Sequence, residues 1–111
     1  MQKYSVIWSK SAEFDLELVI EYIKHDSIVM AKEIFFDIKK ECDQLNFMPD
    51  RKRVVPELQQ MGILKYREVL FKRWRIVFKI EDDKVLVLLV VDGSRNFEDV
   101  MFQRLLGRNE I

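Results

Sequence analysis

Apolar residues recur along the chain with two different periods, and the change of period divides it into elements. Residues 3–8 place Tyr4, Val6 and Trp8 on one side, which predicts a short strand. Residues 11–26 and the stretch from 27 to Pro49 instead have apolar residues at three- and four-residue spacing, which predicts two amphipathic helices. Their apolar stripes are Ala12, Leu16, Val19, Ile20 and Ile23, then Ala31, Ile34, Phe35, Ile38, Cys42 and Leu45.

Polar residues at the start of each predicted helix supply an N-terminal cap. Ser9 or Ser11 suits the first helix, and Asp26 or Ser27 suits the second. Because only a few residues join the helices, we expect an antiparallel hairpin with both apolar stripes facing one layer. The opposite side of the first helix carries Glu13, Glu17 and Glu21, which predicts an acidic outer face.

The second half of the chain changes to a strand-like period. Residues 56–61 predict a short helical turn that Gly62 closes, and alternation begins at Leu64. In the following strand Trp74, Ile76, Phe78 and Ile80 alternate with Arg73, Arg75, Val77 and Lys79, which predicts a mostly basic opposite face. Residues 84–91 are apolar on both faces, as in a central strand, and residues 94–106 predict a C-terminal helix.

These elements predict one α+β domain over residues 1–111. Its order is β-α-α-β-β-β-α, after counting the turn at residues 56–61 as a connection. We expect a twisted antiparallel sheet of about four strands, packed against the N-terminal helical hairpin and followed by the short C-terminal helix.

Charge is distributed unevenly on a chain whose formal net charge is zero. Residues 1–50 carry 6 Lys and Arg against 10 Asp and Glu, a difference of −4, and residues 51–111 carry 13 against 9, a difference of +4. The basic half predicts a local patch for a polyanion or an acidic partner. The alternative is that these are solvated charges without a site.

The cysteine and histidine content excludes several kinds of chemistry. Cys42 is the single cysteine and His25 the single histidine, so neither an internal disulfide nor a conventional zinc site is available. Cys42 lies in the apolar stripe of the second predicted helix and is interpreted as a buried hydrophobic residue, and His25 as a turn residue. No apolar run reaches the roughly 18 residues that a membrane span needs. We therefore expect a cytoplasmic protein without metal, cofactor or membrane partner.

Several motifs, taken in order, resemble the RelE/ParE superfamily of type II toxin–antitoxin toxins. They are WSKSAEFDLELVIEYI in the first helix, VVPEL after the hairpin, KYREV and WRIVF in two strands, and VLVLLVVDGSRN before the last helix. The resemblance covers nearly the whole chain. It implies a growth-inhibitory toxin, typical of plasmid-stabilisation systems, that a cognate antitoxin neutralises by lying across the sheet or the helical hairpin.

The resemblance implies two alternative targets. RelE-like toxins cut messenger RNA on the ribosome, whereas ParE-like toxins inhibit DNA gyrase and cut nothing. Aligned to the RelE-like pattern, Arg67, Arg75 and Arg95 are the cations that a phosphate would contact. Val69 and Met101, however, stand where that pattern has a second lysine and the late aromatic acid or base. Since a thioether transfers no proton, we prefer gyrase inhibition, with the ribosome-dependent nuclease and an inactive or simple binding protein as alternatives.

Further residues are candidates for contacts with the target or the antitoxin. Arg51, Lys52 and Arg53 form a basic turn that suits a phosphate backbone or an acidic segment, or is merely solvated. Apolar residues of the C-terminal helix are candidates for the antitoxin contact: Met101, Phe102, Leu105 and Leu106.

The register of the hairpin around Lys72 and Arg73 decides whether the candidate arginines share a face. A three-residue loop places Arg67 and Arg75 on one face, and a two-residue loop places them on opposite faces. Because the turn lacks Gly and Asn, the sequence favours the three-residue loop.

Overall fold

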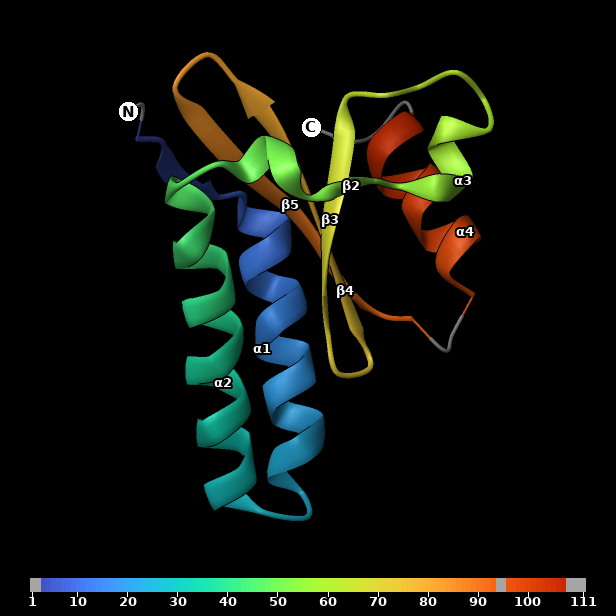
Figure 1. Cartoon of the computed structure of the whole chain (residues 1–111). Helices are drawn as coiled ribbons and strands as arrows, with labels where there is room; N and C mark the ends of the chain where they lie inside the picture. The colour runs from blue at the N-terminus through green and yellow to red at the C-terminus, as the bar shows by residue number, and fades with distance from the viewer. Residues whose placement is uncertain (1–2, 94–95, 108–111) are drawn as a thin grey trace.

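The computed structural model describes residues 3–93 and 96–107 and consists of a mixed sheet with helices on both faces (Figure 1). Its elements are β1 (Ser5–Trp8), α1 (Lys10–Lys24), α2 (Ile28–Asp43), β2 (Arg53–Val54), α3 (Pro56–Gln59), β3 (Tyr66–Phe71), β4 (Trp74–Glu81), β5 (Lys84–Asp92) and α4 (Phe97–Met101). Short 3₁₀ turns lie at Gln44–Asn46 and Pro49–Arg51, and a π-helical turn at Phe102–Leu106 continues α4. Within the described ranges, no helix combines the length and apolar character needed to cross a membrane.

Serine caps begin both helices of the N-terminal hairpin. The Ser9 side chain accepts a hydrogen bond from the amide of Ala12, and the Ser27 side chain accepts one from the amide of Met30, each at 3.0 Å. Each cap satisfies an amide that has no partner inside its helix. The structure thereby selects Ser9 over Ser11 and Ser27 over Asp26 among the predicted caps.

The sheet confirms the predicted α+β architecture and adds two details. Its strand order is β1-β5-β4-β3-β2, with antiparallel pairing from β5 to β2. The N-terminal strand β1 pairs in parallel with β5, with Ser5 opposite Lys84 and Trp8 opposite Val87. The two-residue strand β2 was not predicted, so the sheet has five strands and is mixed rather than purely antiparallel.

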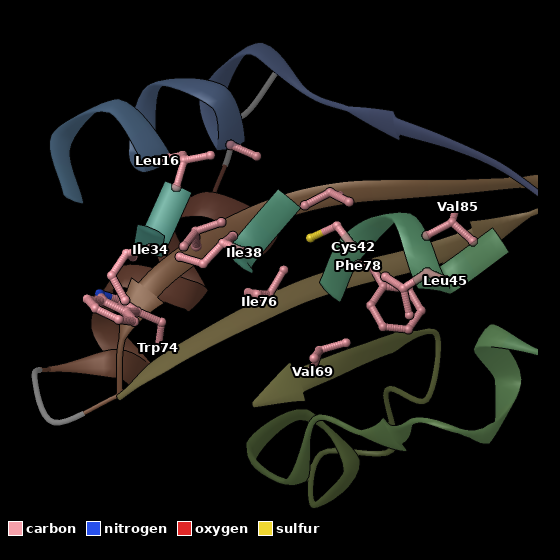
Figure 2. Close-up of a cluster of buried hydrophobic side chains, with 13 residues drawn as sticks. Leu16, Ile34, Ile38, Cys42, Leu45, Val69, Trp74, Ile76, Phe78 and Val85 are labelled. Atoms are coloured by element: carbon pink, nitrogen blue, oxygen red, sulfur yellow. The ribbon is translucent and has the colours of Figure 1, made fainter. Parts of the chain in front are cut away.

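The main hydrophobic core lies between the hairpin and one face of the sheet (Figure 2). The predicted stripes of both helices supply Leu16, Ile34 and Ile38, which pack on Ile76 and Phe78 of β4. Cys42 belongs to this core and is fully buried, which confirms its interpretation as a hydrophobic residue. Burial raises the pKa of its thiol to about 12, so the thiol stays protonated at neutral pH.

The other face of the sheet carries a second hydrophobic cluster beneath α3 and α4. Val77 and Leu89 of the sheet pack there with Leu58 of α3 and with Phe97 and Met101 of α4. The face of β4 opposite the main core does carry Arg75, Val77 and Lys79, as predicted, but Val77 is buried and the two basic side chains are only partly exposed. Strand alternation identified which residues leave the first core, but two short helices cover much of the face onto which they project.

The β3–β4 hairpin is closed by a two-residue turn, so the predicted three-residue loop is wrong. Phe71 pairs with Trp74, and Leu70 pairs with Arg75. Arg67 is three residues from Leu70 and therefore projects from the sheet face opposite to that of Arg75. Lys72 makes the tight turn by adopting a left-handed conformation with φ of 53°.

Replacing Lys72 with glycine is expected to stabilise the chain by about 0.5–1 kcal/mol. A left-handed conformation costs a residue with a Cβ about 1–2 kcal/mol, and the greater freedom of glycine in the unfolded chain offsets part of the gain. Thermal unfolding measures the change as a higher Tm. Lys72→Ala is the matched control because it removes the same charge but keeps the Cβ, and an equal rise in Tm for both variants would contradict the explanation.

Candidate functional site

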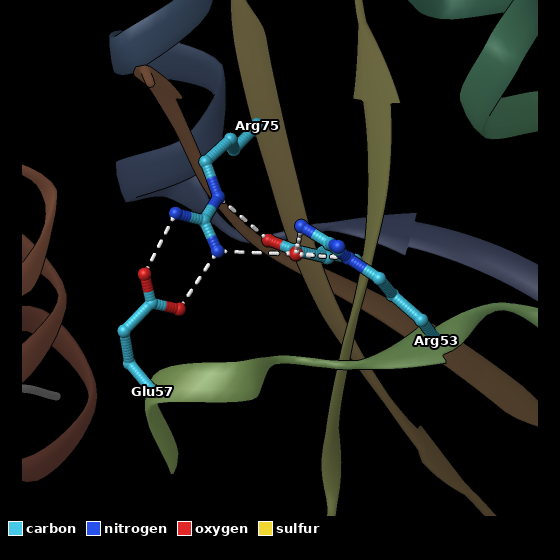
Figure 3. A network of polar contacts seen from close by, with 4 residues as sticks. Arg53, Glu57 and Arg75 are labelled. Atoms are coloured by element: carbon cyan, nitrogen blue, oxygen red, sulfur yellow. Dashed lines mark hydrogen bonds and ion pairs between the residues drawn. The ribbon is translucent and has the colours of Figure 1, made fainter. Parts of the chain in front are cut away.

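A network of four charged side chains lies on the sheet face beside α3 and α4 (Figure 3). Its centre is Glu68 of β3, whose side chain has 0% exposure. Arg75 of β4 donates from Nε to Glu68 Oε1 at 2.8 Å and from Nη2 to Glu68 Oε2 at 3.1 Å. Arg53 of β2 donates from Nε to Glu68 Oε2 at 2.6 Å. The buried carboxylate is thus held by two arginines from neighbouring strands.

Arg75 also binds the first turn of α3. Its Nη1 and Nη2 donate to the two carboxylate oxygens of Glu57 at 3.0 and 2.8 Å. The Phe97 ring covers the guanidinium, with 3.5 Å between Cζ and the ring centroid. All three nitrogens of the Arg75 guanidinium therefore donate to carboxylates, and one face packs on an aromatic ring. The network fixes α3 and α4 to the sheet.

The charges in this network stabilise one another. Burial by itself lowers the pKa of Arg75, but its hydrogen bonds to Glu57 and Glu68 outweigh burial and raise it. The hydrogen bond from Arg75 lowers the pKa of Glu57 below its usual value of 4.5. Both residues are consequently charged at neutral pH, and Arg75 is neutralised from within the protein.

The contribution of Glu57 to stability is expected to depend on pH. Because its folded-state pKa is lowered, the carboxylate stabilises the fold fully above about pH 4.5 and progressively less as the pH falls through the lowered pKa. Glu57→Gln should therefore lower the free energy of unfolding by about 1 kcal/mol at pH 7 and by much less at pH 3. Urea unfolding of both proteins across this range provides the measurement, and a pH-independent difference would contradict the ion pair.

The predicted cations are not brought together by the described structure. Arg75 lies in the network, whereas Arg67 projects from the other face and donates to the carbonyl of Lys52 at 2.6 Å. Arg95 lies outside the described residues. Of the basic turn, Arg51 and Lys52 are exposed and lie outside the network, and Arg53 binds Glu68 with about half of its side chain exposed.

The predicted antitoxin residues differ in their exposure. Met101 is fully buried in the second hydrophobic cluster and offers no surface to a partner. Phe102 and Leu105 are half-buried against the same cluster. Leu106 is exposed.

An apolar groove that the sequence did not predict lies near the tip of the α1–α2 helical hairpin, where this hairpin extends past the sheet. Its volume is about 700 Å³, and its walls include Leu18 and Tyr22 of α1, Met30 of α2, Trp74 of β4 and Val100 of α4. Leu18, Tyr22 and Met30 are 53%, 70% and 49% exposed, which is high for large apolar side chains. An exposed apolar surface of this kind is typical of a binding site for another protein.

The sequence does contain a signal for this groove. Phe14, Leu18 and Tyr22 follow one another at four-residue spacing on α1, outside the stripe that packs on the sheet, and the last two of them line the groove. The prediction of an acidic outer face overlooked them because the glutamates are interleaved with them. A second apolar row on an already amphipathic helix indicates a second contact surface.

Asp15 lines the groove and, with Arg104, joins α1 to the C-terminal turn and to β5. Arg104 donates from Nη1 and Nη2 to the two Asp15 carboxylate oxygens at 3.0 and 2.9 Å, and from Nη2 to the carbonyl of Leu88 at 3.1 Å. Asp15 also accepts a hydrogen bond from the amide of Val90 at 3.0 Å. These contacts satisfy backbone groups on the part of β5 that extends beyond β1.

Comparison with known proteins places this geometry among toxins. A family model described as the ParE toxin of the type II toxin–antitoxin system parDE matches residues 6–97. A solved structure titled as the chromosomal ParDE TA system from P. aeruginosa is 15% identical, covers 81% of this chain and 96% of its own, and has a TM-score of 0.67. The RelBE2 toxin–antitoxin complex from Mycobacterium tuberculosis is 17% identical, covers 86% and 97%, and has a TM-score of 0.54. No curated protein matches the chain significantly by sequence.

Proposed function

The chain belongs to the ParE toxin family of type II toxin–antitoxin systems, and from this premise we propose that it arrests growth by inhibiting DNA gyrase and does not cleave RNA. The observation that carries the choice of target is the neutralisation of Arg75 by Glu57 and Glu68. A nuclease needs cations presented to the scissile phosphate and a group that transfers a proton. Arg75 presents no free donor edge, and Arg67 lies across the sheet from it.

Inhibition of gyrase requires a complementary surface and no catalytic group. The exposed cations near β2, namely Arg51, Lys52 and the exposed part of Arg53, are the proposed target contacts, together with Arg67 and Arg95 from the sequence analysis. Charges at the rim of an interface chiefly accelerate association and select the partner. The same basic residues support the second candidate, ribosome-dependent cleavage of messenger RNA, so the two mechanisms need a direct comparison.

Two assays with the purified chain separate these mechanisms. We expect it to block supercoiling of relaxed plasmid by DNA gyrase and to leave messenger RNA on programmed ribosomes intact. Ribosome-dependent cleavage with unimpaired supercoiling would replace our proposal with the RelE-like mechanism. Normal bacterial growth during verified soluble expression of the chain alone would contradict a toxin of either kind.

We further propose that the cognate antitoxin neutralises the chain by placing an amphipathic helix in the apolar groove. The groove is lined by Leu18 and Tyr22, which lie one turn apart on α1, and by Trp74 of β4 and Val100 of α4. Apolar residues at three- and four-residue spacing on a partner helix would fill such a groove. Leu106 on the C-terminal turn is a proposed additional contact, while Phe102 and Leu105 offer only their exposed parts. The two solved toxin–antitoxin systems similar to this chain support an antitoxin partner.

A further inference from the structure

The outer edge of β3 is only partly covered by another strand. β2 pairs with β3 at two positions, Arg53 opposite Glu68 and Val54 opposite Arg67. Within residues 3–93 and 96–107, no strand pairs with Val69–Phe71 on this side. Since an uncovered strand edge presents unpaired amide and carbonyl groups, this segment offers a template for another strand.

The backbone of Leu70 is the part of this edge that faces outward. The amide of Val55 donates to the carbonyl of Tyr66 at 2.9 Å, so the Tyr66 carbonyl points towards β2. In an antiparallel strand, residues separated by an even number point their backbone groups to the same side. The amide and carbonyl of Leu70, four residues later, therefore point away from β4. The Leu70 side chain is 52% exposed.

The surroundings of Leu70 are cationic. A hollow of about 350 Å³ is lined by Leu70 together with Arg53, Lys72, Arg73 and Arg75. Three of these cations are held by carboxylates, but those carboxylates do not line the hollow. Lys72 has no acidic group within ion-pair distance in the described part of the chain, and its Nζ lies 5.7 Å from the Phe71 ring centroid. The edge thus combines outward backbone groups with a positively charged lining.

We propose that this edge binds a short, extended, acidic segment of a partner protein, which adds to the sheet beside Leu70 as a further strand. The Leu70 amide and carbonyl supply the backbone pairing, and alternate side chains of the segment lie over the hollow. Carboxylates at those positions meet Lys72 and the exposed parts of Arg53 and Arg73, whereas Arg75 stays bound to Glu57 and Glu68. Lys72, Arg73 and Trp74 also line the apolar groove, so the two surfaces are neighbours, but strand pairing at Leu70 does not require the groove to be occupied.

A polypeptide suits the site better than a nucleic acid. The central feature is a backbone amide beside a backbone carbonyl with an apolar side chain between the cations, and a strand supplies the complementary pair of groups. Single-stranded nucleic acids depend instead on aromatic platforms for their bases. The aromatic residue of the hollow, Trp74, is buried in the core beneath the hairpin and offers no such platform.

Amide hydrogen exchange of the isotope-labelled full chain tests the proposal. The probe is a peptide with blocked ends that alternates Glu and Val, and its counterpart alternates Lys and Val. At saturating acidic peptide we expect exchange of the Leu70 amide to slow by about fivefold or more, as expected for one new hydrogen bond. The Val69 amide should change little because it already points towards β4. An unchanged Leu70 amide, or equal protection by the basic peptide, would overturn the proposal.

A charge reversal provides a second test with a matched control. Lys72→Glu should weaken binding of the acidic peptide by about threefold or more, because it replaces an attractive charge at the edge of the site with a repulsive one. Lys65→Glu makes the same charge change at an exposed residue that does not line the hollow, and should leave affinity close to that of the unmodified chain. Equal losses would overturn the assignment, as would oligothymidylate that protects the Leu70 amide as strongly as the acidic peptide.

Discussion

Glu68→Gln is expected to destabilise the chain by about 3 kcal/mol, although the two side chains have nearly the same shape. Removing one member of a buried ion pair typically costs about 3–5 kcal/mol because the remaining charge is left without compensation. Glu68 is fully buried and binds both Arg53 and Arg75. Since Arg75 retains Glu57 in the variant, the lower end of that range applies. Urea unfolding with an unchanged m-value provides the measurement.

Glu57→Gln is the matched control for this prediction. It makes the same chemical change in the other carboxylate that binds Arg75, but the Glu57 side chain is 25% exposed whereas that of Glu68 is 0% exposed. Solvent can compensate for the loss at Glu57, so we expect a cost of about 1 kcal/mol at neutral pH. Equal costs for the two variants would show that burial does not determine the strength of this network.

The hairpin and the sheet were predictable because their cores follow simple periods. Every stripe residue of the two helices is buried or packs against the buried cluster, and Ile76 and Phe78 of β4 face the hairpin as their alternation predicts. Such patterns depend on which residues leave water, and burial of one face imposes the period directly. The parallel pairing of β1 left no comparable signal, since alternation does not indicate strand direction.

The electrostatic part of the site was not predictable from the same patterns. Alternation placed Arg75 away from the main core but gave no information on what lies over it. Its partners come from 18 and 7 residues earlier in the chain, and both depend on the β3–β4 register and on the position of α3. That register in turn required Lys72 to adopt a positive φ, against the preference of the turn sequence. Arg75, which the sequence placed on an outward basic face, therefore lies in an internal ion-pair network.

The apolar groove and the charged network differ in what they offer a partner. The network is satisfied internally, so a ligand of Arg75 must first displace Glu57 or Glu68. Leu18 and Tyr22 instead remain largely exposed in the free chain, and covering them releases water without breaking an internal contact. Neutralisation by a partner is consequently expected to depend chiefly on the groove.

Leu18→Glu is expected to leave the chain toxic but to prevent its neutralisation. The substitution places a carboxylate in the apolar wall, where a bound antitoxin helix would desolvate it without a partner. Loss of a central apolar contact together with this penalty should weaken the binding free energy of the complex by at least about 2 kcal/mol, which corresponds to a roughly 30-fold higher Kd. Co-expression with the cognate antitoxin, scored as colony formation, and titration of the purified pair both measure the effect.

Phe14→Glu separates loss of the groove from a general effect of charge on α1. Phe14 is 58% exposed on the same helix, one turn before Leu18, and does not line the groove. This variant should be toxic alone and fully neutralised by the antitoxin. If both variants escape neutralisation, the antitoxin covers the outer surface of α1 rather than the groove. If Leu18→Glu is still neutralised, the antitoxin binds elsewhere, and the exposed row on α1 must serve the toxin's target or another partner.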